Sequence, residues 1–219
     1  GSHHTVVVGV SVDLRGLHMA SDVDFNRKSF TTGHTGFGIP FLTLPDRTDV
    51  PRNCARGLRY LDRYVFISQG EVFYTTEVLA KIEGIERGPA GNTSLAGAIA
   101  LAKELDREQI LVVQETEYTS AGKLPSSQLT FAKENGIEVR RGNPKENIPG
   151  KTIVIPESVG QVEVEDFDIA KIHYSYVENA LKKANDYTPT EEDIQFLSED
   201  SKSTIAYVRE TIRALNGKK

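Results

Sequence analysis

The sequence predicts an α/β protein in which a parallel sheet is flanked by helices. Short apolar runs typical of buried strands alternate along the chain with longer segments of helical periodicity. Glycine, proline and capping residues separate these segments. With 219 residues, of which 38% are hydrophobic and 26% charged, the chain is long enough to bury a sizeable core in one or two domains.

The N-terminal part holds one expected strand and one long loop. Residues 1–4 are expected to be a tag remnant or a loop, and the valine-rich residues 6–12 predict a buried strand. Residues 13–51 show little periodicity, and loops of this length are usually functional or disordered. Within them, residues 33–38 contain three glycines, which permit a close approach of the backbone to another group.

The next strand and helix carry clear local signals. Residues 62–67 predict a strand, and a helix is expected over residues 69–83. Ser68 and Glu71 have the spacing of a capping box, in which each side chain accepts from the other residue's backbone N–H. Gly84 follows the periodic run and suits the left-handed C-cap position.

A glycine-rich turn at residues 88–91 precedes a second helix, which Asn92 or Thr93 is expected to cap. The apolar face expected for this helix consists of four residues, namely Leu95, Ile99, Ala102 and Leu105. Residues 110–113, Ile-Leu-Val-Val, are uniformly apolar and bounded by charged residues. This run predicts a strand that is buried on both faces of a parallel sheet.

The remainder of the chain predicts one more helix and strand, then a helical tail. A helix is expected from Pro125 to residues 135–136, followed by a strand at 137–140 and an irregular stretch at 143–158. Residues 149–152 resemble half of a P-loop, but Lys145 stands where that pattern requires glycine. Three helices are expected at 164–185, 189–197 and 202–215, with Thr188 as the cap of the second. We therefore expect an α/β domain at 5–160 and a helical extension at 161–219.

Composition excludes several classes of function. The net charge of −5 and the pI near 5.6 argue against a nucleic-acid or anionic-membrane partner. The apolar runs are shorter than the roughly 18 residues that a membrane span requires. The single cysteine, Cys54, cannot form an intrachain disulfide and is compatible with a reducing cytoplasm, where we expect the protein. Histidine and cysteine do not have metal-ligand spacing, so no metal is expected.

Two places are candidates for binding a ligand. The turn at residues 91–94 presents the N-terminus of a helix, which favours an anion. Residues 114–119 follow a predicted strand, and open α/β sheets bind ligands at the carboxyl ends of their strands. The simpler alternative is that residues 92–94 only cap the helix and residues 114–119 form a polar loop.

Four blocks in order resemble the C-terminal half of the fold-type II pyridoxal-phosphate (PLP) enzymes, the cysteine synthase and threonine synthase group with the tryptophan synthase beta fold. The blocks are residues 6–12, 33–40, 61–85 and 89–113, so the resemblance covers residues 5–140. A closer resemblance, to PLP-dependent thiolases, rests on residues 16–22, 34–38, 88–93 and 113–119 and extends through the tail. It implies a CoA-dependent acyltransferase of ornithine degradation that works with a small alpha subunit, as an oligomer.

The resemblance also implies roles for particular residues. Cysteine synthases place a serine of the helix turn at the pyridine nitrogen, but Ala90 and Gly91 stand there in this chain. Threonine synthase relatives use a hydroxyl after the next strand, so Thr116 is the expected partner of the nitrogen. Further cofactor-binding residues are then Glu115, Asn92 and Gly36, and residues near the substrate are His34, Thr35 and Glu117.

Two parts of the family pattern have no counterpart in this sequence. The Schiff-base lysine of the family lies in a Ser-x-Ser-x-Lys motif, and no lysine here has that setting. The glycine-rich phosphate loop that precedes the first strand in the family is absent as well. We therefore expect an N-terminal half of the same enzyme as a partner. The alternatives are another fold-type II lyase or synthase, a non-catalytic binding module with the same fold, and an unrelated α/β enzyme.

Overall fold

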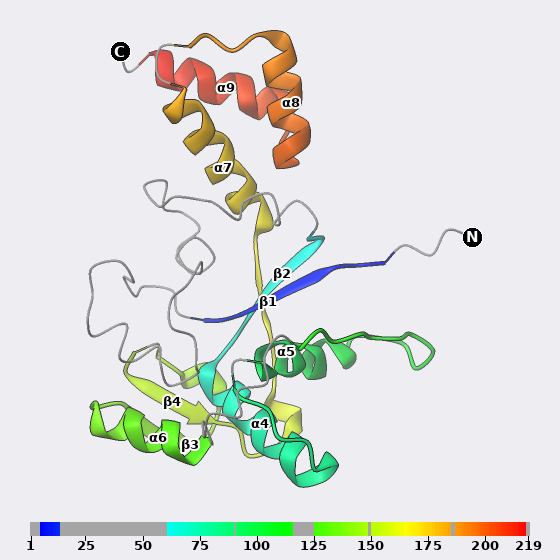
Figure 1. Cartoon of the computed structure of the whole chain (residues 1–219), viewed down its shortest axis with the longest axis vertical. Coiled ribbons are helices and arrows are strands. Elements are labelled where there is room, and N and C mark those ends of the chain that lie inside the picture. Colours follow the sequence, from blue (N-terminus) through cyan, green and yellow to red (C-terminus); the bar gives the residue numbers. More distant parts are fainter. Residues whose placement is uncertain are drawn as a thin grey trace. The chain divides into compact units, whose positions relative to one another are not determined.

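The computed structural model describes residues 5–13, 61–89, 91–115, 125–148, 150–184 and 187–217. It is an α/β structure with helices and two small sheets (Figure 1). The chain divides into two compact units. One comprises Gly9–Phe37 and Val65–Asp166, and the other Gly1–Val8, Gly38–Tyr64 and Phe167–Lys219. Within the described ranges, no helix combines the length and the apolar composition needed to cross a bilayer.

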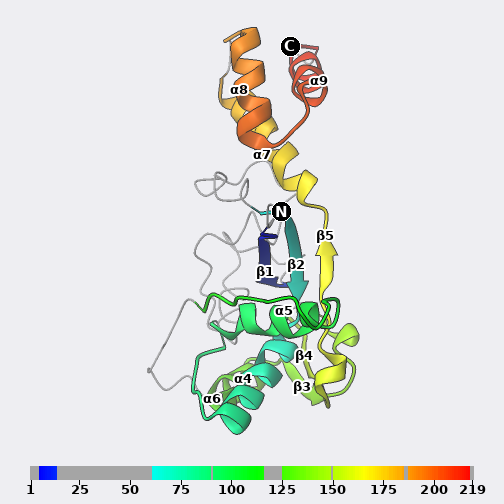
Figure 2. The ribbon, with the colours of Figure 1, turned by 90° about the vertical axis from the view of Figure 1, so that its right-hand side faces the viewer.

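A three-stranded sheet contains both strands predicted in the first third of the chain. Its order is β1 (Val8–Val12), β2 (Arg63–Ile67) and β5 (Glu165–Phe167), as Figure 2 shows. The Asp62 N–H donates to the Val7 carbonyl at one end of the first pair, and the Asp13 N–H donates to the Ile67 carbonyl at the other, both at 2.8 Å. These bonds show that β1 and β2 run in the same direction, as predicted.

Helix α4 (Gln69–Glu83) confirms the local signals in its sequence. The Ser68 hydroxyl accepts from the Glu71 N–H at 3.3 Å, and the Glu71 carboxylate accepts from the Ser68 N–H at 2.8 Å. Gly84 closes the helix with φ +67°, the left-handed conformation that glycine adopts without strain. Both ends were predictable because each depends only on residues within one turn of the helix.

The Glu71 carboxyl also joins α4 to a distant loop. It is buried, and its second oxygen accepts from the Glu163 N–H at 2.7 Å. Burial raises the pKa of the Glu71 carboxyl above its ordinary value, although hydrogen bonds from Glu163 and Ser68 oppose this shift. The folded chain therefore holds this proton more tightly than the unfolded chain does.

We expect Glu71 to make stability depend on pH in a specific direction. Its contribution to the free energy of unfolding is fully present below the unfolded pKa and is lost as the pH rises through the raised pKa of the folded state. In urea unfolding between about pH 4 and about pH 7, the free energy of the parent chain should therefore fall relative to that of a Glu71→Gln variant. Parallel pH profiles of the two proteins would contradict this prediction.

The second sheet pairs β3 (Glu138–Arg141) with β4 (Thr152–Ile155) in parallel, with Val139 opposite Ile153. Strand β3 and helix α6 (Pro125–Glu134) confirm the predicted helix and strand. Strand β4 corrects the expectation that residues 143–158 are irregular. A core made by α4, α6 and this sheet contains five buried residues, namely Phe73, Ala132, Ile137, Ile153 and Ile155. β4 forms because its apolar residues complete this core.

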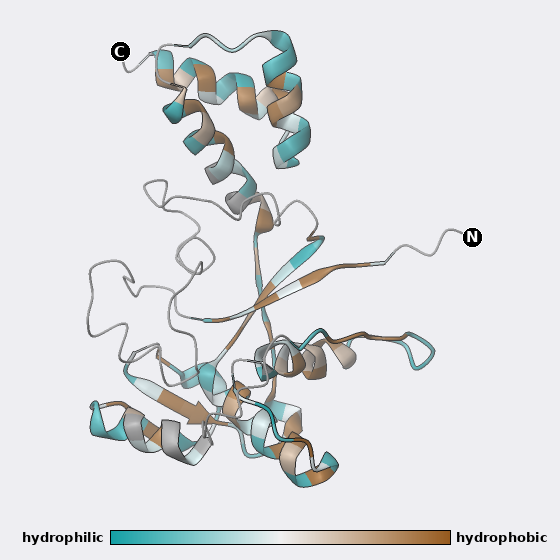
Figure 3. Cartoon of the chain, in the orientation of Figure 1, coloured by the Kyte–Doolittle hydropathy of each residue, from teal (hydrophilic) through white to brown (hydrophobic). Residues whose placement is uncertain are grey.

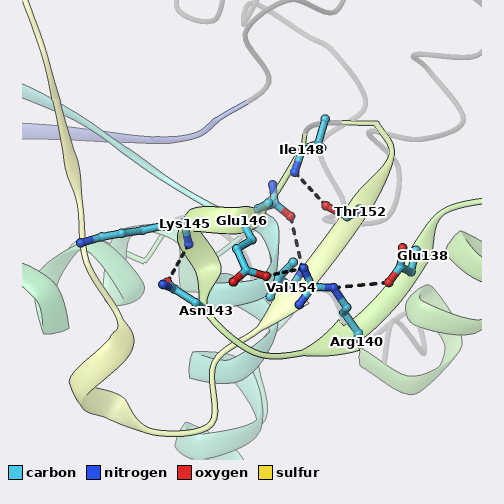
Figure 4. A network of polar contacts seen from close by, with 9 residues as sticks. Glu138, Arg140, Asn143, Lys145, Glu146, Ile148, Thr152 and Val154 are labelled. Atoms are coloured by element: carbon cyan, nitrogen blue, oxygen red, sulfur yellow. Dashed lines mark hydrogen bonds and ion pairs between the residues drawn. The ribbon is translucent and has the colours of Figure 1, made fainter.

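Polar contacts fix the connection between β3 and β4 (Figure 4). The Arg140 guanidinium lies between two carboxylates, 2.6 Å from Glu146 and 3.3 Å from Glu138. The Asn147 side chain accepts from the Val154 N–H, and the Thr152 hydroxyl accepts from the Ile148 N–H. The connection includes a short 3₁₀ turn, η2 (Pro144–Glu146), which Asn143 caps. The bonds from Ile148 and Asn147 tie the connection to the first and third residues of β4.

Helix α5 (Asn92–Ala102) lies where it was predicted but buries a different face. Its buried apolar residues are small, namely Ala96, Ala98, Ala100 and Leu101, whereas Leu95 and Ile99 are half-buried and Ala102 is exposed. A Cβ atom at Gly97 would lie 2.7 Å from both methyl carbons of Val10. The helix therefore approaches β1 along its small residues, because larger ones would clash with the sheet.

The predicted strand at 110–113 is absent, and this prediction is wrong for the structure. Residues 109–115 form no strand, and Ile110 is 90% exposed and Val112 88% exposed. A strand requires a hydrogen-bonded neighbouring strand, and the local sequence does not show whether one is present. Within the described part of the chain, the backbone of residues 110–113 forms no hydrogen bond.

The C-terminal part contains three helices, α7 (Ile169–Lys183), α8 (Glu191–Ser201) and α9 (Ile205–Asn216). Val177, Ile194 and Val208 form their common core. Strand β5 occupies the first residues of the predicted first helix. The predicted cap of α8 was two residues early, because Thr190 and Asp193, rather than Thr188 and Glu191, form the capping box. The 2.7 Å bond from the Tyr187 hydroxyl to Asp193 supports this start.

Candidate cofactor-binding site

The structure describes two of the predicted site residues, Asn92 and Glu115. The predicted partner of the pyridine nitrogen, Thr116, lies outside the described residues. So do the other four, namely Gly36, His34, Thr35 and Glu117. The site can therefore be built from the first turn of α5, the facing part of α4 and the segment that ends at Glu115.

Asn92 is fully buried in the first turn of α5, and its amide orientation is set by a chain of hydrogen bonds. The Thr76 hydroxyl donates to the Val72 carbonyl at 2.8 Å, so its oxygen acts as the acceptor for Asn92 Nδ2 at 3.1 Å. The amide oxygen then points away from Thr76. Within the described part of the chain, Asn92 Oδ1 meets no hydrogen-bond donor. Such a buried acceptor is costly and is commonly completed by a ligand or water.

Thr75, which precedes Thr76 in α4, was not predicted from the sequence as a site residue. Thr75 is 1% exposed, and its hydroxyl has no partner within the described residues. Two adjacent threonines in a helix interior are a recognisable signal, because β-branched hydroxyl residues are poor helix formers there. Thr76 therefore presents its hydroxyl to α5, and Thr75 adds a second buried hydroxyl next to it in the sequence.

The first turn of α5 has the properties of an anion-binding helix terminus. Gly91 occupies the N-cap position without a side-chain cap, and the first turn contains no acidic residue. The predicted capping by Asn92 or Thr93 is wrong, since both lie inside the helix. The Thr93 hydroxyl instead contacts the Pro89 carbonyl at 3.4 Å. Neither a side-chain cap at Gly91 nor an acid in the first turn therefore neutralises the positive end of the helix dipole, which favours a negatively charged group.

Ser94 brings the segment after α5 back to this turn. Its hydroxyl lies 2.8 Å from the Gln114 carbonyl and 3.1 Å from the Gly91 carbonyl, and the shorter distance marks the stronger bond. The hydrogen bond places Gln114, and with it the adjacent Glu115, beside the start of α5. The described parts of the two ligand-binding places predicted from the sequence, residues 91–94 and 114–115, therefore lie side by side.

Glu115 carries a partly buried carboxylate at this point. Its side chain is 22% exposed, and Arg87 Nε lies 3.7 Å from Oε2, which is an ion-pair distance but too long for a hydrogen bond. Burial raises the pKa of the Glu115 carboxyl above its ordinary value, and the charge of Arg87 only partly opposes this. Glu115 therefore keeps its proton to a higher pH than a fully solvated glutamate.

These groups can recognise a polar ligand that carries both a hydrogen-bond donor and a negative charge. Asn92 offers a buried acceptor, Glu115 an acid of raised pKa, and the α5 terminus a positive potential. Across the described ranges, histidine, cysteine, aspartate and glutamate form no cluster of three that could hold a metal ion.

Comparison with known proteins relates the chain to subunits of an enzyme. It is 63% identical, over 215 residues and 98% of its length, to a 2-amino-4-ketopentanoate thiolase beta subunit from an unidentified prokaryote. It is 55% identical, over 96% of its length, to the 2-amino-4-ketopentanoate thiolase beta subunit of Acetoanaerobium sticklandii. No family model and no solved structure gives a significant match.

The chain spans slightly less than half the length of these relatives. The matched segments cover 46% of the first relative and 45% of the second. More than half of each relative therefore lies outside the region of similarity.

Proposed function

We propose that the chain is part of the beta subunit of a thiolase that cleaves 2-amino-4-oxopentanoate (2-amino-4-ketopentanoate) with CoA to alanine and acetyl-CoA, a step of ornithine degradation. The observation that carries this proposal is the 55–63% identity to two beta subunits of that name over nearly the whole chain. Such a subunit works with an alpha subunit, and the cofactor-anchoring lysine would lie in the part of the enzyme that this chain does not match.

We propose pyridoxal 5'-phosphate as the cofactor and the fold-type II architecture as its framework. When bound, the pyridine ring supplies an electron sink for a substrate carbanion. The buried Oδ1 of Asn92 supports this assignment, because it requires a donor that the described residues do not provide. Asn92 would accept a hydrogen bond from the cofactor and hold it against α5.

The residue at the pyridine nitrogen decides how strongly the ring withdraws electrons. A threonine hydroxyl, as proposed for Thr116, leaves the ring largely neutral, whereas a carboxyl group favours a protonated ring. Glu115 is the adjacent alternative, and its raised pKa makes it a proton donor at higher pH than a solvated glutamate. In either case the segment that Ser94 holds at the start of α5 carries the group that tunes the cofactor.

The proposal predicts activity only after complementation. The chain would be combined with the unmatched part of the 63% identical relative and with its alpha subunit, and acetyl-CoA would be measured. We expect formation of acetyl-CoA that requires 2-amino-4-oxopentanoate, CoA and pyridoxal phosphate together. The chain alone should bind the cofactor weakly and turn over no substrate.

Three results would contradict parts of this proposal. Turnover by the chain alone, with a visible absorption band that borohydride removes, would show that it contains the anchoring lysine. Activity of the complemented enzyme without pyridoxal phosphate would exclude the cofactor. A complemented enzyme that binds the cofactor but acts only on other amino acids would indicate a different fold-type II lyase or synthase.

A further inference from the structure

An apolar segment of the chain remains accessible although the sequence has the pattern of a buried strand. Ile110 and Val112 are almost fully exposed, whereas Leu111 between them is 36% exposed and Val113 is half-buried. This alternation with a period of two is typical of a strand with two different faces. The backbone of residues 110–113 forms no hydrogen bond within the described part of the chain, so none of the described residues occupies its donors and acceptors.

Apolar residues of α5 adjoin this segment. The bond from Ser94 to the Gln114 carbonyl joins the end of the segment to the first turn of the helix. Leu95 and Ile99 are only half-buried, and Leu105 in the turn after α5 is 37% exposed. Figure 3 shows the hydrophobic colour along both α5 and the segment that follows it. Burial of such surface is worth about 25 cal/mol per Å² of apolar area, which favours a partner that covers it.

We propose that residues 110–113 become a β-strand when the rest of the enzyme supplies a neighbouring strand, which pairs with them edge to edge. The occupant is the part of the subunit that lies outside the matched 46% of the first relative. More than half of that subunit is available to supply a strand, and an edge with free donors and acceptors is a template for one. This inference does not depend on the identity of the cofactor.

A second copy of the same chain is a poor occupant because of the charges that flank the segment. The symmetric antiparallel register that pairs all four apolar residues of two copies sets Ile110 opposite Val113, and Glu108 then lies opposite Glu115. Like charges directly opposite each other on neighbouring strands destabilise the pair. Acidic flanks are a known device against such self-association.

Two substitutions test the pairing. Val112→Pro removes a backbone donor, and Val112→Lys replaces an apolar side chain with a charged one. Because Val112 is 88% exposed, neither should lower the melting temperature of the isolated chain. Ile82→Lys is the matched control, since Ile82 is 73% exposed at the end of α4 in the same unit.

The measurements are the affinity of the chain for the unmatched part of the 63% identical relative, and hydrogen exchange of residues 110–113 with and without that part. Both are made without cofactor or substrate, so their outcome is separate from that of the activity assay. We expect each Val112 variant to bind at least about tenfold more weakly and Ile82→Lys to bind normally. We also expect the amides of residues 110–113 to become protected in the complex.

Several outcomes would overturn the inference. It is wrong if the two parts do not associate, or if they associate without protection of residues 110–113. Equal losses of affinity for the unmatched part in Val112→Lys and Ile82→Lys would show that the added positive charge, rather than the loss of strand pairing, weakens binding. Dimers of the isolated chain that Val112→Pro dissociates, seen by light scattering, would assign the strand to a second copy instead.

Discussion

Replacement of Gly70 by alanine is expected to cost about 3 kcal/mol or more of the free energy of unfolding. A Cβ atom at this position would lie 1.8 Å from the Val154 carbonyl oxygen and 2.4 Å from its carbon. Both are backbone atoms of β4, which cannot move aside easily. Val154 is paired in register with Arg140 of β3, and its N–H donates to the Asn147 side chain. The first turn of α4 would therefore have to separate from the sheet.

Urea unfolding followed by circular dichroism measures this effect. Gly160→Ala is the control, because the same substitution at Gly160 places the new atom 3.6 Å from the Ser158 hydroxyl, an ordinary contact. We expect its free energy of unfolding to change by about 0.5 kcal/mol or less. If Gly70→Ala were as stable as Gly160→Ala, the close packing of α4 on β4 would be wrong.

Replacement of Asn92 by leucine is expected to lower the affinity of the complemented enzyme for pyridoxal phosphate by about tenfold to a hundredfold. Leucine has a similar size but removes the buried Oδ1 acceptor, and a hydrogen bond to a charged ligand is worth about 1.5–3 kcal/mol. Stability should change far less. The Thr76 hydroxyl keeps its bond to the Val72 carbonyl, so leucine leaves no buried donor without a partner.

The cofactor affinity is measured by absorbance or fluorescence titration, together with the melting temperature. Thr93→Val is the control in the same helix turn, because it removes a buried hydroxyl but leaves the Asn92 acceptor in place. Its affinity for the cofactor should stay within about twofold of the parent. If the Asn92→Leu enzyme had the parent's melting temperature and the parent's affinity for pyridoxal phosphate, Asn92 would have a packing role only and would not bind the cofactor.

Local signals explain what the sequence predicted correctly. Helix α4 was placed residue by residue, since Ser68, Glu71 and Gly84 specify its two ends within single turns. Strand β2 and helix α6 followed from apolar runs and from Pro125 in the same way. The error at α8 is of the same local kind. Thr188 and Thr190 both have an acidic residue three positions later, but only Thr190 and Asp193 form a capping box.

Features that depend on distant contacts could not be predicted in this way. Residues 110–113 have the composition of a strand, but pairing requires a neighbour that the local pattern does not contain. Strand β4 was missed because its apolar run, Ile153–Ile155, has only three residues, and the core with Phe73 and Ala132 selects it. At the candidate site, Asn92, Glu115 and the turn that includes Ser94 were named in advance, whereas Thr75 and the bond from Ser94 to Gln114 appear only in the structure.

The glycine at position 97 has a consequence for the amide five residues earlier. Two methyl groups of Val10 fill the space that a side chain at Gly97 would need. Helix α5 therefore packs on β1 in one orientation about the helix axis. A rigid helix turned about its axis would carry its first residue with it. The absence of a side chain in the middle of the helix thereby fixes the direction of the Asn92 carboxamide at its start, and a larger residue at position 97 would turn that group without contacting it.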